Sequence, residues 1–396
     1  MRAKQAGFLG GVLVAEIANN ALHIAQPLLI YELTHSFGKA ALFTSGETLV
    51  HMAGTAAAGW PCDRLGSRRV LFWSTILRGC ALAAIPLLWS CGRLTLGLAA
   101  AAYTADAFIR GAFDTAVHAL PMGLAEGQAE RDRLNARYEL CFDLGAVAGP
   151  SLLAVIMARA SGFAANALVP FGFLAGALAF LAIPASADAA SGQRARTGTF
   201  EGLRLLLKDR GLLISCLGLA SFNLYPLRKL VAAFFAKALL GDGAAAGWLG
   251  AAFGLGGVCG SLLYDRRGAR SRPEGWILLG ALGALALAFG WIPEAFWPMS
   301  ACVFAFSLTN VCARLALTRK VQERTPVALA GGVTAVTRAA SNLSSVGIKA
   351  VVGAAFALGA SGAEAFTIVG LGLTVLAVVQ LALASAAPRQ AAVAAS

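Results

Sequence analysis

Two stretches of the sequence decide the fold: GWPCDRLGSRR at residues 59–69 and GSLLYDRRGAR at residues 260–270. Both contain the pattern D-R-x-G-x-R, and about half of the 396-residue chain separates them. Each stretch lies between two long apolar runs. A charged loop that recurs at the same place in each half indicates that the chain consists of two parallel repeats.

The composition around these loops is too apolar for a protein that folds in water. Hydrophobic residues make up 58% of the chain, charged residues make up 13%, and the mean hydropathy is +0.72. A soluble domain holds about 45–50% apolar and about 25% charged residues. These figures exclude collagen-like, disulfide-rich and disordered chains and leave a polytopic helical membrane protein. The eight cysteines form no C-x-x-C pair, which argues against a zinc or disulfide framework.

The apolar runs predict an all-α membrane protein with twelve transmembrane helices, because one span needs about 20 apolar residues. The first run is interpreted as a span and not as a removed signal peptide. The expected spans are residues 7–31, 40–60, 69–90, 95–121, 134–158, 164–184, 211–238, 244–264, 274–292, 295–318, 330–357 and 364–386.

One long connection divides these spans into two groups of six. It covers residues 185–210, and its segment 200–208 has the pattern of a short amphipathic helix lying at the membrane surface. We therefore expect an N-terminal six-helix bundle at 1–184, a cytoplasmic linker at 185–210 and a C-terminal six-helix bundle at 211–396.

The basic residues predict the orientation in the membrane. Most of the 32 Lys and Arg fall in alternate loops counted from the N-terminus, whereas the opposite loops hold only Lys39, Arg93, Arg159 and Lys237. Cytoplasmic loops collect Lys and Arg, so both termini are expected in the cytoplasm, with the chain in the inner membrane. The net charge of +12 is assigned to these loops and not to nucleic-acid binding. The expected partners are the lipid bilayer and a small-molecule substrate, with the chain acting as a monomer.

The stretch at 59–69 resembles the signature loop G-x-x-x-D-R-x-G-R-R/K of the major facilitator superfamily, and the stretch at 260–270 resembles its degenerate second copy. The resemblance implies the major facilitator fold, two pseudo-symmetric six-helix bundles, over the whole chain. It also implies that these loops latch the two halves on the cytoplasmic side. The alternative is a loop that is merely basic. The implied gate residues are Gly59, Asp63, Arg64, Gly66, Arg68, Asp265, Arg266, Gly268 and Arg270.

Weaker resemblances refine this interpretation. The stretch GAVAGP at 145–150 resembles the G-x-x-x-G-P element of exporters in this superfamily that run substrate against protons, although Ser151 stands where a further glycine is usual. The alternative is a packing face of small residues with a kink. Residues 200–210 and 322–331 are similar to the siderophore-exporter branch, which includes enterobactin exporters.

Charges inside the expected spans are unevenly distributed between the halves. Ionisable groups at this depth usually face a cavity or a partner. The cations of the second half must therefore meet acids of the first half, snorkel to the membrane surface or bind an anionic substrate. The first half holds Glu16, Glu47, Arg78, Asp106, Arg110, Asp114, Glu139 and Asp143, whereas the second holds Arg228, Lys229, Arg314, Arg338 and Lys349.

Helical spacing selects the candidate site residues. Asp106, Arg110, Asp114 and His118 recur every fourth residue and share one helix face. This face is interpreted as a proton-carrying site or, alternatively, as a ladder that neutralises itself. Glu16, Asp106 and Asp114 are the proton-coupling candidates. In the family that the loops resemble, spans one, four, seven and ten line a central cavity. The substrate-binding candidates are Asn20, His23, Arg110, Asn223, Arg228, Asn310, Arg314, Arg338 and Asn342.

The combined pattern predicts a proton-coupled secondary transporter that works by alternating access and is not an enzyme. No G-x-x-x-x-G-K-[ST] loop is present, so ATP hydrolysis is not expected, and no cofactor or bound metal is expected. The predicted substrate is a small anionic or zwitterionic metabolite, such as a carboxylate metallophore or siderophore, which the chain exports. The first alternative is a multidrug exporter. The next is a metal-ion exporter using Glu16, His23, Asp106 and His118, and the last is a membrane-embedded enzyme acting on lipid headgroups.

Overall fold

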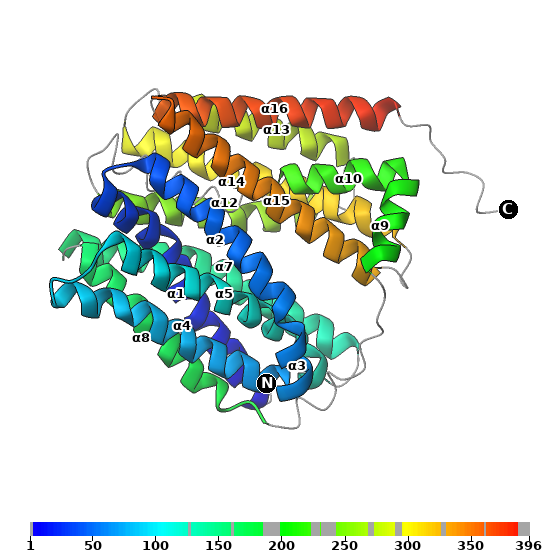
Figure 1. Ribbon diagram of the computed structural model, residues 1–396. Coiled ribbons are helices and arrows are strands. Elements are labelled where there is room, and N and C mark those ends of the chain that lie inside the picture. Colours follow the sequence, from blue (N-terminus) through cyan, green and yellow to red (C-terminus); the bar gives the residue numbers. More distant parts are fainter. Residues whose placement is uncertain are drawn as a thin grey trace.

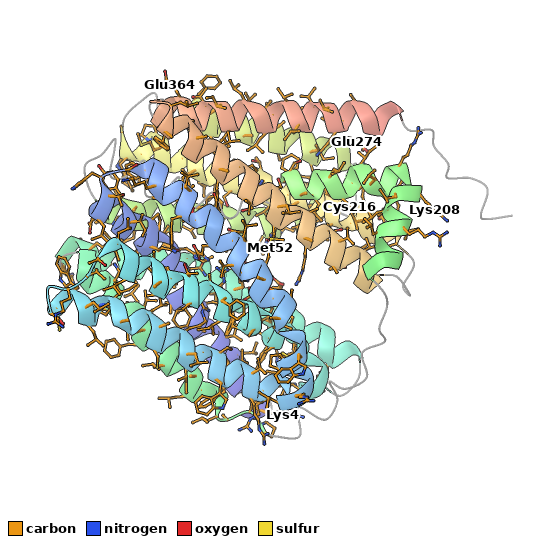
Figure 2. The ribbon with its side chains drawn as sticks, in the orientation of Figure 1. Lys4, Met52, Lys208, Cys216, Glu274 and Glu364 are labelled. Atoms are coloured by element: carbon orange, nitrogen blue, oxygen red, sulfur yellow. The ribbon has the colours of Figure 1, made fainter. Side chains whose placement is uncertain are left out.

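The computed structural model describes residues 3–125, 128–159, 162–184, 199–222, 230, 243–267, 273–289, 295–325, 330–359 and 362–386. Within these ranges every regular element is a helix. The helices of the first half lie in the lower part of Figure 1 and those of the second half in the upper part. Charged residues gather at helix ends, as Figure 2 shows for Lys4, Lys208, Glu274 and Glu364.

Each predicted span of the first half coincides with a helix. Two of these helices start at the caps that their sequences provide: Ser36 Oγ accepts a bond from the Lys39 backbone N–H, and Thr95 Oγ1 accepts one from Leu98. The helices are α1 (Ala3–Thr34), α2 (Phe37–Ala57), α3 (Gly59–Leu65), α4 (Ser67–Ser90), α5 (Leu96–Ala119), α6 (Pro121–Leu124), α7 (Gln128–Arg159) and α8 (Gly162–Phe180).

The second half contains α9 (Thr199–Lys208), α10 (Arg210–Ser221), α12 (Gly243–Arg267), α13 (Pro273–Phe289), α14 (Phe296–Arg324), α15 (Ala330–Ala357) and α16 (Gly362–Ala386). The helix predicted at 200–208 is confirmed as α9. It buries Leu206 against the second half and exposes Leu207, as an amphipathic helix does. The predicted span at 211–238 begins as α10, and its part beyond residue 222, apart from Leu230, lies outside the described residues.

Six helical segments among the described residues are long and apolar enough to cross a membrane. Several other helices are equally apolar but shorter in their described part. The arrangement of exactly twelve crossings therefore stays a prediction. The six segments are Lys4–Thr34, Ser67–Ser90, Arg137–Arg159, Ala244–Tyr264, Phe296–Arg324 and Val333–Ala357.

Among the described residues two helix pairs make the main contacts between the halves: α2 packs against α15, and α7 packs against α12. Both contacts are close because glycine leaves no side chain between the backbones. A Cβ added to Gly254 of α12 would lie 2.5 Å from the Ala146 carbonyl oxygen of α7, and one added to Gly247 would lie 2.5 Å from that of Pro150. One added to Gly38 of α2 would lie 3.0 Å from Phe356 Cβ of α15.

The stretch at 145–150 is a packing face, as the alternative interpretation expected. On α7, a Cβ added to Gly145 would lie 2.7 Å from Glu16 Cβ of α1, and one added to Gly149 would collide with the Ile17 carbonyl oxygen. The opposite side of the same stretch contacts α12. Helix α7 is therefore wedged between the first helix and the second half.

Candidate functional site

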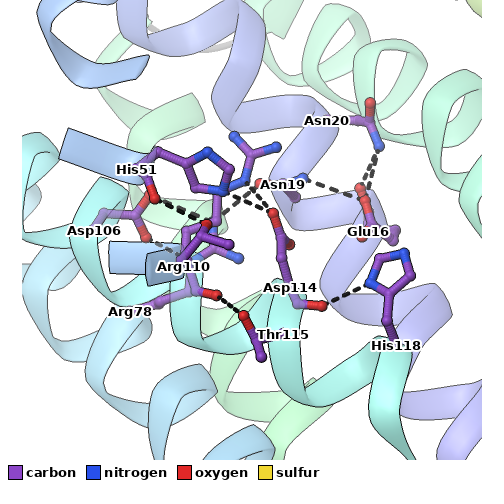
Figure 3. A network of polar contacts seen from close by, with 12 residues as sticks. Glu16, Asn19, Asn20, His51, Arg78, Asp106, Arg110, Asp114, Thr115 and His118 are labelled. Atoms are coloured by element: carbon purple, nitrogen blue, oxygen red, sulfur yellow. Dashed lines mark hydrogen bonds and ion pairs between the residues drawn. The ribbon is translucent and has the colours of Figure 1, made fainter. Parts of the chain in front are cut away.

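A buried ion pair lies at the centre of the first half. Arg78 of α4 and Asp106 of α5 are 0% and 2% exposed. Arg78 Nε lies 2.8 Å from Asp106 Oδ1, and its Nη2 lies 3.3 Å from Oδ2. The guanidinium also stacks over the rings of Phe173 and Phe113, at 4.1 and 5.5 Å. A two-point contact of this kind fixes both groups, because the guanidinium fork matches the carboxylate (Figure 3).

Asn19 of α1 links this ion pair to Glu16, and Asn20 adds a second amide donor. Asn19 Oδ1 accepts a bond of 3.0 Å from Arg78 Nη2, and Asn19 Nδ2 donates one of 3.2 Å to Glu16 Oε2. Asn20 Nδ2 donates to the Glu16 carbonyl oxygen at 2.8 Å and to Oε2 at 3.5 Å. Glu16 is 3% exposed. The buried carboxyl group therefore receives two amide donors and is linked to a fixed positive charge.

A second cluster surrounds Asp114 of α5 and is partly exposed. His51 Nε2 of α2 lies 2.9 Å from Asp114 Oδ2, and Arg110 Nε lies 3.8 Å from the same oxygen. His118 Nδ1 donates a bond of 2.6 Å to the Asp114 carbonyl oxygen. The side chains of His51, Arg110 and Asp114 are 20%, 22% and 32% exposed. These groups are thus only partly buried, unlike Asp106.

The two clusters are close enough to interact electrostatically. Glu16 lies within electrostatic range of both Asp114 and Arg110, so Arg110 stands near both carboxyl groups. A proton or a positively charged group that reaches Asp114 changes the field at Glu16. Coupled titration of this kind requires proximity and does not require a direct bond.

Acids of the first half were one of the three predicted partners for the cations of the second half; Arg314 lies near such an acid, whereas Lys349 bonds to neutral oxygen atoms. Lys349 Nζ of α15 donates to Thr48 Oγ1 at 2.7 Å and to the Thr44 carbonyl oxygen at 3.1 Å, both on α2. Arg314 of α14 lies within electrostatic range of Asp143 of α7. The opposing halves therefore supply part of the compensation for these charges.

The remaining predicted substrate residues have varied environments. Asn310 Nδ2 donates a bond of 3.0 Å to the Phe222 carbonyl oxygen at the end of α10, so its amide joins two helices. Arg338 is exposed on α15 and lies within electrostatic range of Tyr138 of α7. His23 is buried in α1 and Asn342 is half-buried in α15. Asn223 and Arg228 lie outside the described residues.

Helical spacing alone misassigned one partner. The proposed self-neutralising ladder paired Arg110 with both Asp106 and Asp114, but Asp106 binds Arg78 of α4 and only Asp114 contacts Arg110. The sequence-based site also omitted Arg78, Asn19 and His51. The signal for Arg78 was an arginine in the middle of an expected span, which requires a partner at that depth.

The stretch at 59–69, expected as a loop, forms the short helix α3, a turn at Gly66 and the start of α4. Gly66 has φ +85°, a backbone conformation that favours glycine, and it allows α4 to start at Ser67. Arg64 lies over the Trp60 ring at 5.0 Å. The side chains of Asp63 and Asp265, and all of Gly268 and Arg270, lie outside what the structure describes. A latch between the two loops therefore stays a prediction.

No group of three His, Cys, Asp or Glu among the described residues is placed to hold a metal ion. Glu16, His23, Asp106 and His118, considered as metal ligands from the sequence, are therefore not brought together as a binding site. Asp106 is bound to Arg78 and His118 to a backbone carbonyl. The geometry gives no support for metal-ion export.

These features define a class: a helical membrane protein of two packed halves, with buried and partly exposed charges within the first half. The chain belongs to the Major Facilitator Superfamily, whose sequence model matches residues 8–348. The family consists of multi-pass membrane transporters of small molecules, which are not enzymes and need no cofactor.

Relatives and solved structures agree with this assignment. The multidrug efflux pump Tap of Mycobacterium bovis is 29% identical over 199 residues, 49% of this chain and 47% of Tap. Tap of Mycolicibacterium fortuitum is 26% identical over 269 residues, 65% of each chain. The alignment with the first of these curated relatives thus spans about half of its length.

The fold matches transporters of known structure. The POT family transporter PepTSo has a TM-score of 0.74 at 9% identity, covering 97% of this chain and 98% of that chain. A POT family transporter in complex with 5-aminolevulinic acid has a TM-score of 0.71 at 12% identity, covering 95% and 96%. At these identities the likeness shows the fold alone.

Proposed function

We propose that this chain is a proton-coupled exporter that moves small organic molecules out of the cell by alternating access. The observation that carries the proposal is the half-exposed Asp114, bonded to His51 and Arg110, within electrostatic range of the buried Glu16. Two carboxyl groups that influence each other, one accessible and one buried, can exchange a proton for a substrate.

The two carboxyl groups are assigned different roles. Asp114 is the accessible group that a substrate or a proton meets first, and Glu16 is the group whose charge responds to it. Asp106 was a third candidate from the sequence, but a proton on Asp106 would strand the buried charge of Arg78. We therefore assign Asp106 a structural role.

Multidrug efflux is the first substrate class in this proposal. The Tap relatives are named multidrug efflux pumps, and Asp114 with Glu16 offers negative charge to a cationic drug. Binding an anionic substrate was one predicted role for the second-half cations, but Arg314 lies near the acid Asp143 of the first half. Export of a carboxylate metallophore is the second candidate, favoured by the exposed Arg338.

The test is transport by the purified chain in proteoliposomes with an imposed pH gradient. Ethidium serves as the cationic probe and citrate as the carboxylate probe. We expect gradient-driven movement of ethidium, which Asp114→Asn and Glu16→Gln abolish while ethidium exchange without a gradient persists. Glu323→Gln removes an exposed carboxyl at a helix end and serves as the control. Movement that is independent of the gradient in the wild type would overturn proton coupling, and movement of citrate alone would favour the metallophore class.

We also propose that the chain acts as a monomer in the inner membrane with both termini in the cytoplasm. The distribution of basic loops supports this orientation, and the bacterial efflux relatives support the inner membrane. Cysteines introduced at Lys39 and Arg196 should react with a membrane-impermeant label from opposite sides. Labelling from the same side would contradict the orientation.

A further inference from the structure

The hydrogen bonds around Asn19 fix the orientation of its side-chain amide relative to Glu16. Arg78 Nη2 donates to Asn19 Oδ1, and an arginine side chain stays protonated and has no acceptor atom. If the Asn19 amide were rotated by half a turn, its NH₂ group would face the guanidinium. Two hydrogen-bond donors would then face each other with no acceptor between them. The amide is therefore fixed with Nδ2 toward Glu16 Oε2.

The guanidinium is itself held in place. Asp106 binds it at two points, and Phe173 and Phe113 lie against it. Arg78 is fully buried, so water does not compete for its donors. The orientation of the Asn19 amide is thus imposed by the Arg78–Asp106 pair from the far side of the asparagine.

We propose that Asn19 is a positioning residue, oriented by the Arg78–Asp106 pair, that stabilises the charged form of Glu16 and sets the pH at which Glu16 exchanges its proton. The inference rests on the proposed function and specifies how its buried carboxyl group is tuned. An N–H group that donates to a carboxylate favours its charged form. Among the described contacts both amide donors reach Oε2, so the proton is assigned to Oε1.

The other charged and titratable groups around Glu16 come from four helices, α2, α4, α5 and α7. Helix α4 supplies Arg78, α5 supplies Arg110 and Asp114, and α7 supplies Tyr138 and Cys141. Helix α8 contains no charged residue, and α12 has its charges at its C-terminal end. Helix α2 brings Glu47 and His51, and His51 is bonded to Asp114. Of these groups, Arg78 reaches Glu16 through Asn19.

The test is an infrared pH titration of the full chain in lipid, which reads the protonated carboxyl band directly. The Glu16 band is identified by its loss in Glu16→Gln. We expect Asn19→Leu to move the midpoint of this band to higher pH by about one unit, because a hydrogen bond to a charged group is lost. Arg78→Lys keeps the charge but loses the fork, and should move the midpoint less and in the same direction.

The matched control is Asn166→Leu, which removes a buried amide bonded to Tyr103 in the same half. It should leave the midpoint unchanged. An unshifted midpoint in both Asn19→Leu and Arg78→Lys, or an equal shift in Asn166→Leu, would overturn the proposal. A shifted band together with gradient-independent ethidium transport would instead overturn the proposed function and leave the role of Asn19 intact.

Discussion

The two halves of the molecule handle their charges differently. In the first half Arg78 binds Asp106, and His51 with Arg110 binds Asp114, all between side chains of that half. In the described part of the second half the ion pairs lie at helix ends, and the buried Lys349 bonds to α2 of the other half. The first half is thus electrostatically organised by itself, whereas the second depends on what faces it.

This difference indicates that the first half is better suited to the proposed proton coupling. A preorganised network keeps its donors in place when a proton arrives or leaves, so its response is reproducible from cycle to cycle. Cations that take partners from outside their own half are suited to sensing whether the other half, or a substrate, is present.

The largest expected effect comes from breaking the self-contained pair of the first half. Arg78→Leu leaves Asp106 buried and uncompensated, which should lower the free energy of unfolding by about 3–5 kcal/mol. The double variant Arg78→Leu with Asp106→Leu should recover most of the loss. Thermal unfolding in detergent measures both. A double variant as unstable as the single one would show that the pair is not self-contained.

An intermediate effect is expected on α7, at the place where it packs against both α1 and α12. Gly149→Ala places a methyl group against the Ile17 carbonyl oxygen, which should cost about 1–3 kcal/mol of stability. Gly46→Ala on α2 is the matched control, since nothing lies within 4 Å of a Cβ at that position. Equal unfolding temperatures for the two variants would contradict the close contact between α7 and α1.

The smallest expected effect concerns the cation that crosses between the halves. Lys349→Met removes the hydrogen bonds to Thr44 and Thr48 of α2. A conformer in which α2 and α15 are separated should therefore become more stable, relative to the packed one, by about 1 kcal/mol, which raises its population about fivefold. Distances between spin labels at Arg69 and Lys208, in a background without native cysteines, measure this shift. Arg319→Gln breaks an exposed pair within α14 and should leave the distances unchanged. Equal distributions in all three proteins would show that Lys349 does not hold the halves together.

Much of the fold follows from local sequence. Apolar length predicted where helices lie, and α9 appears where the amphipathic pattern placed it, because both patterns depend on neighbouring residues. The turn before α4 is equally local, because it depends on the positive φ of Gly66.

The site was harder to predict because its contacts join distant residues. The spacing of Asp106 and Arg110 suggested a pair within one helix, but helix packing brings Arg78 from α4 closer to Asp106. Asn19 has no sequence pattern of its own, since its role comes from Arg78 on one side and Glu16 on the other. Contacts that join three residues from more than one helix are fixed by tertiary structure, and the spacing of residues along one helix does not reveal them.

The glycine-lined contact between α7 and α12 has a consequence for how fast these two helices can slide past each other. Where Gly247 and Gly254 meet Pro150 and Ala146, the nearest atoms across the contact are backbone carbonyl oxygens. Interlocking side chains must change rotamer before two helices slide, whereas smooth surfaces can slide without that activation step. A bulky residue at the contact between α7 and α12 would therefore raise the barrier to sliding. It would lower the turnover rate and steepen the temperature dependence of that rate, and leave the affinity for substrate unaltered.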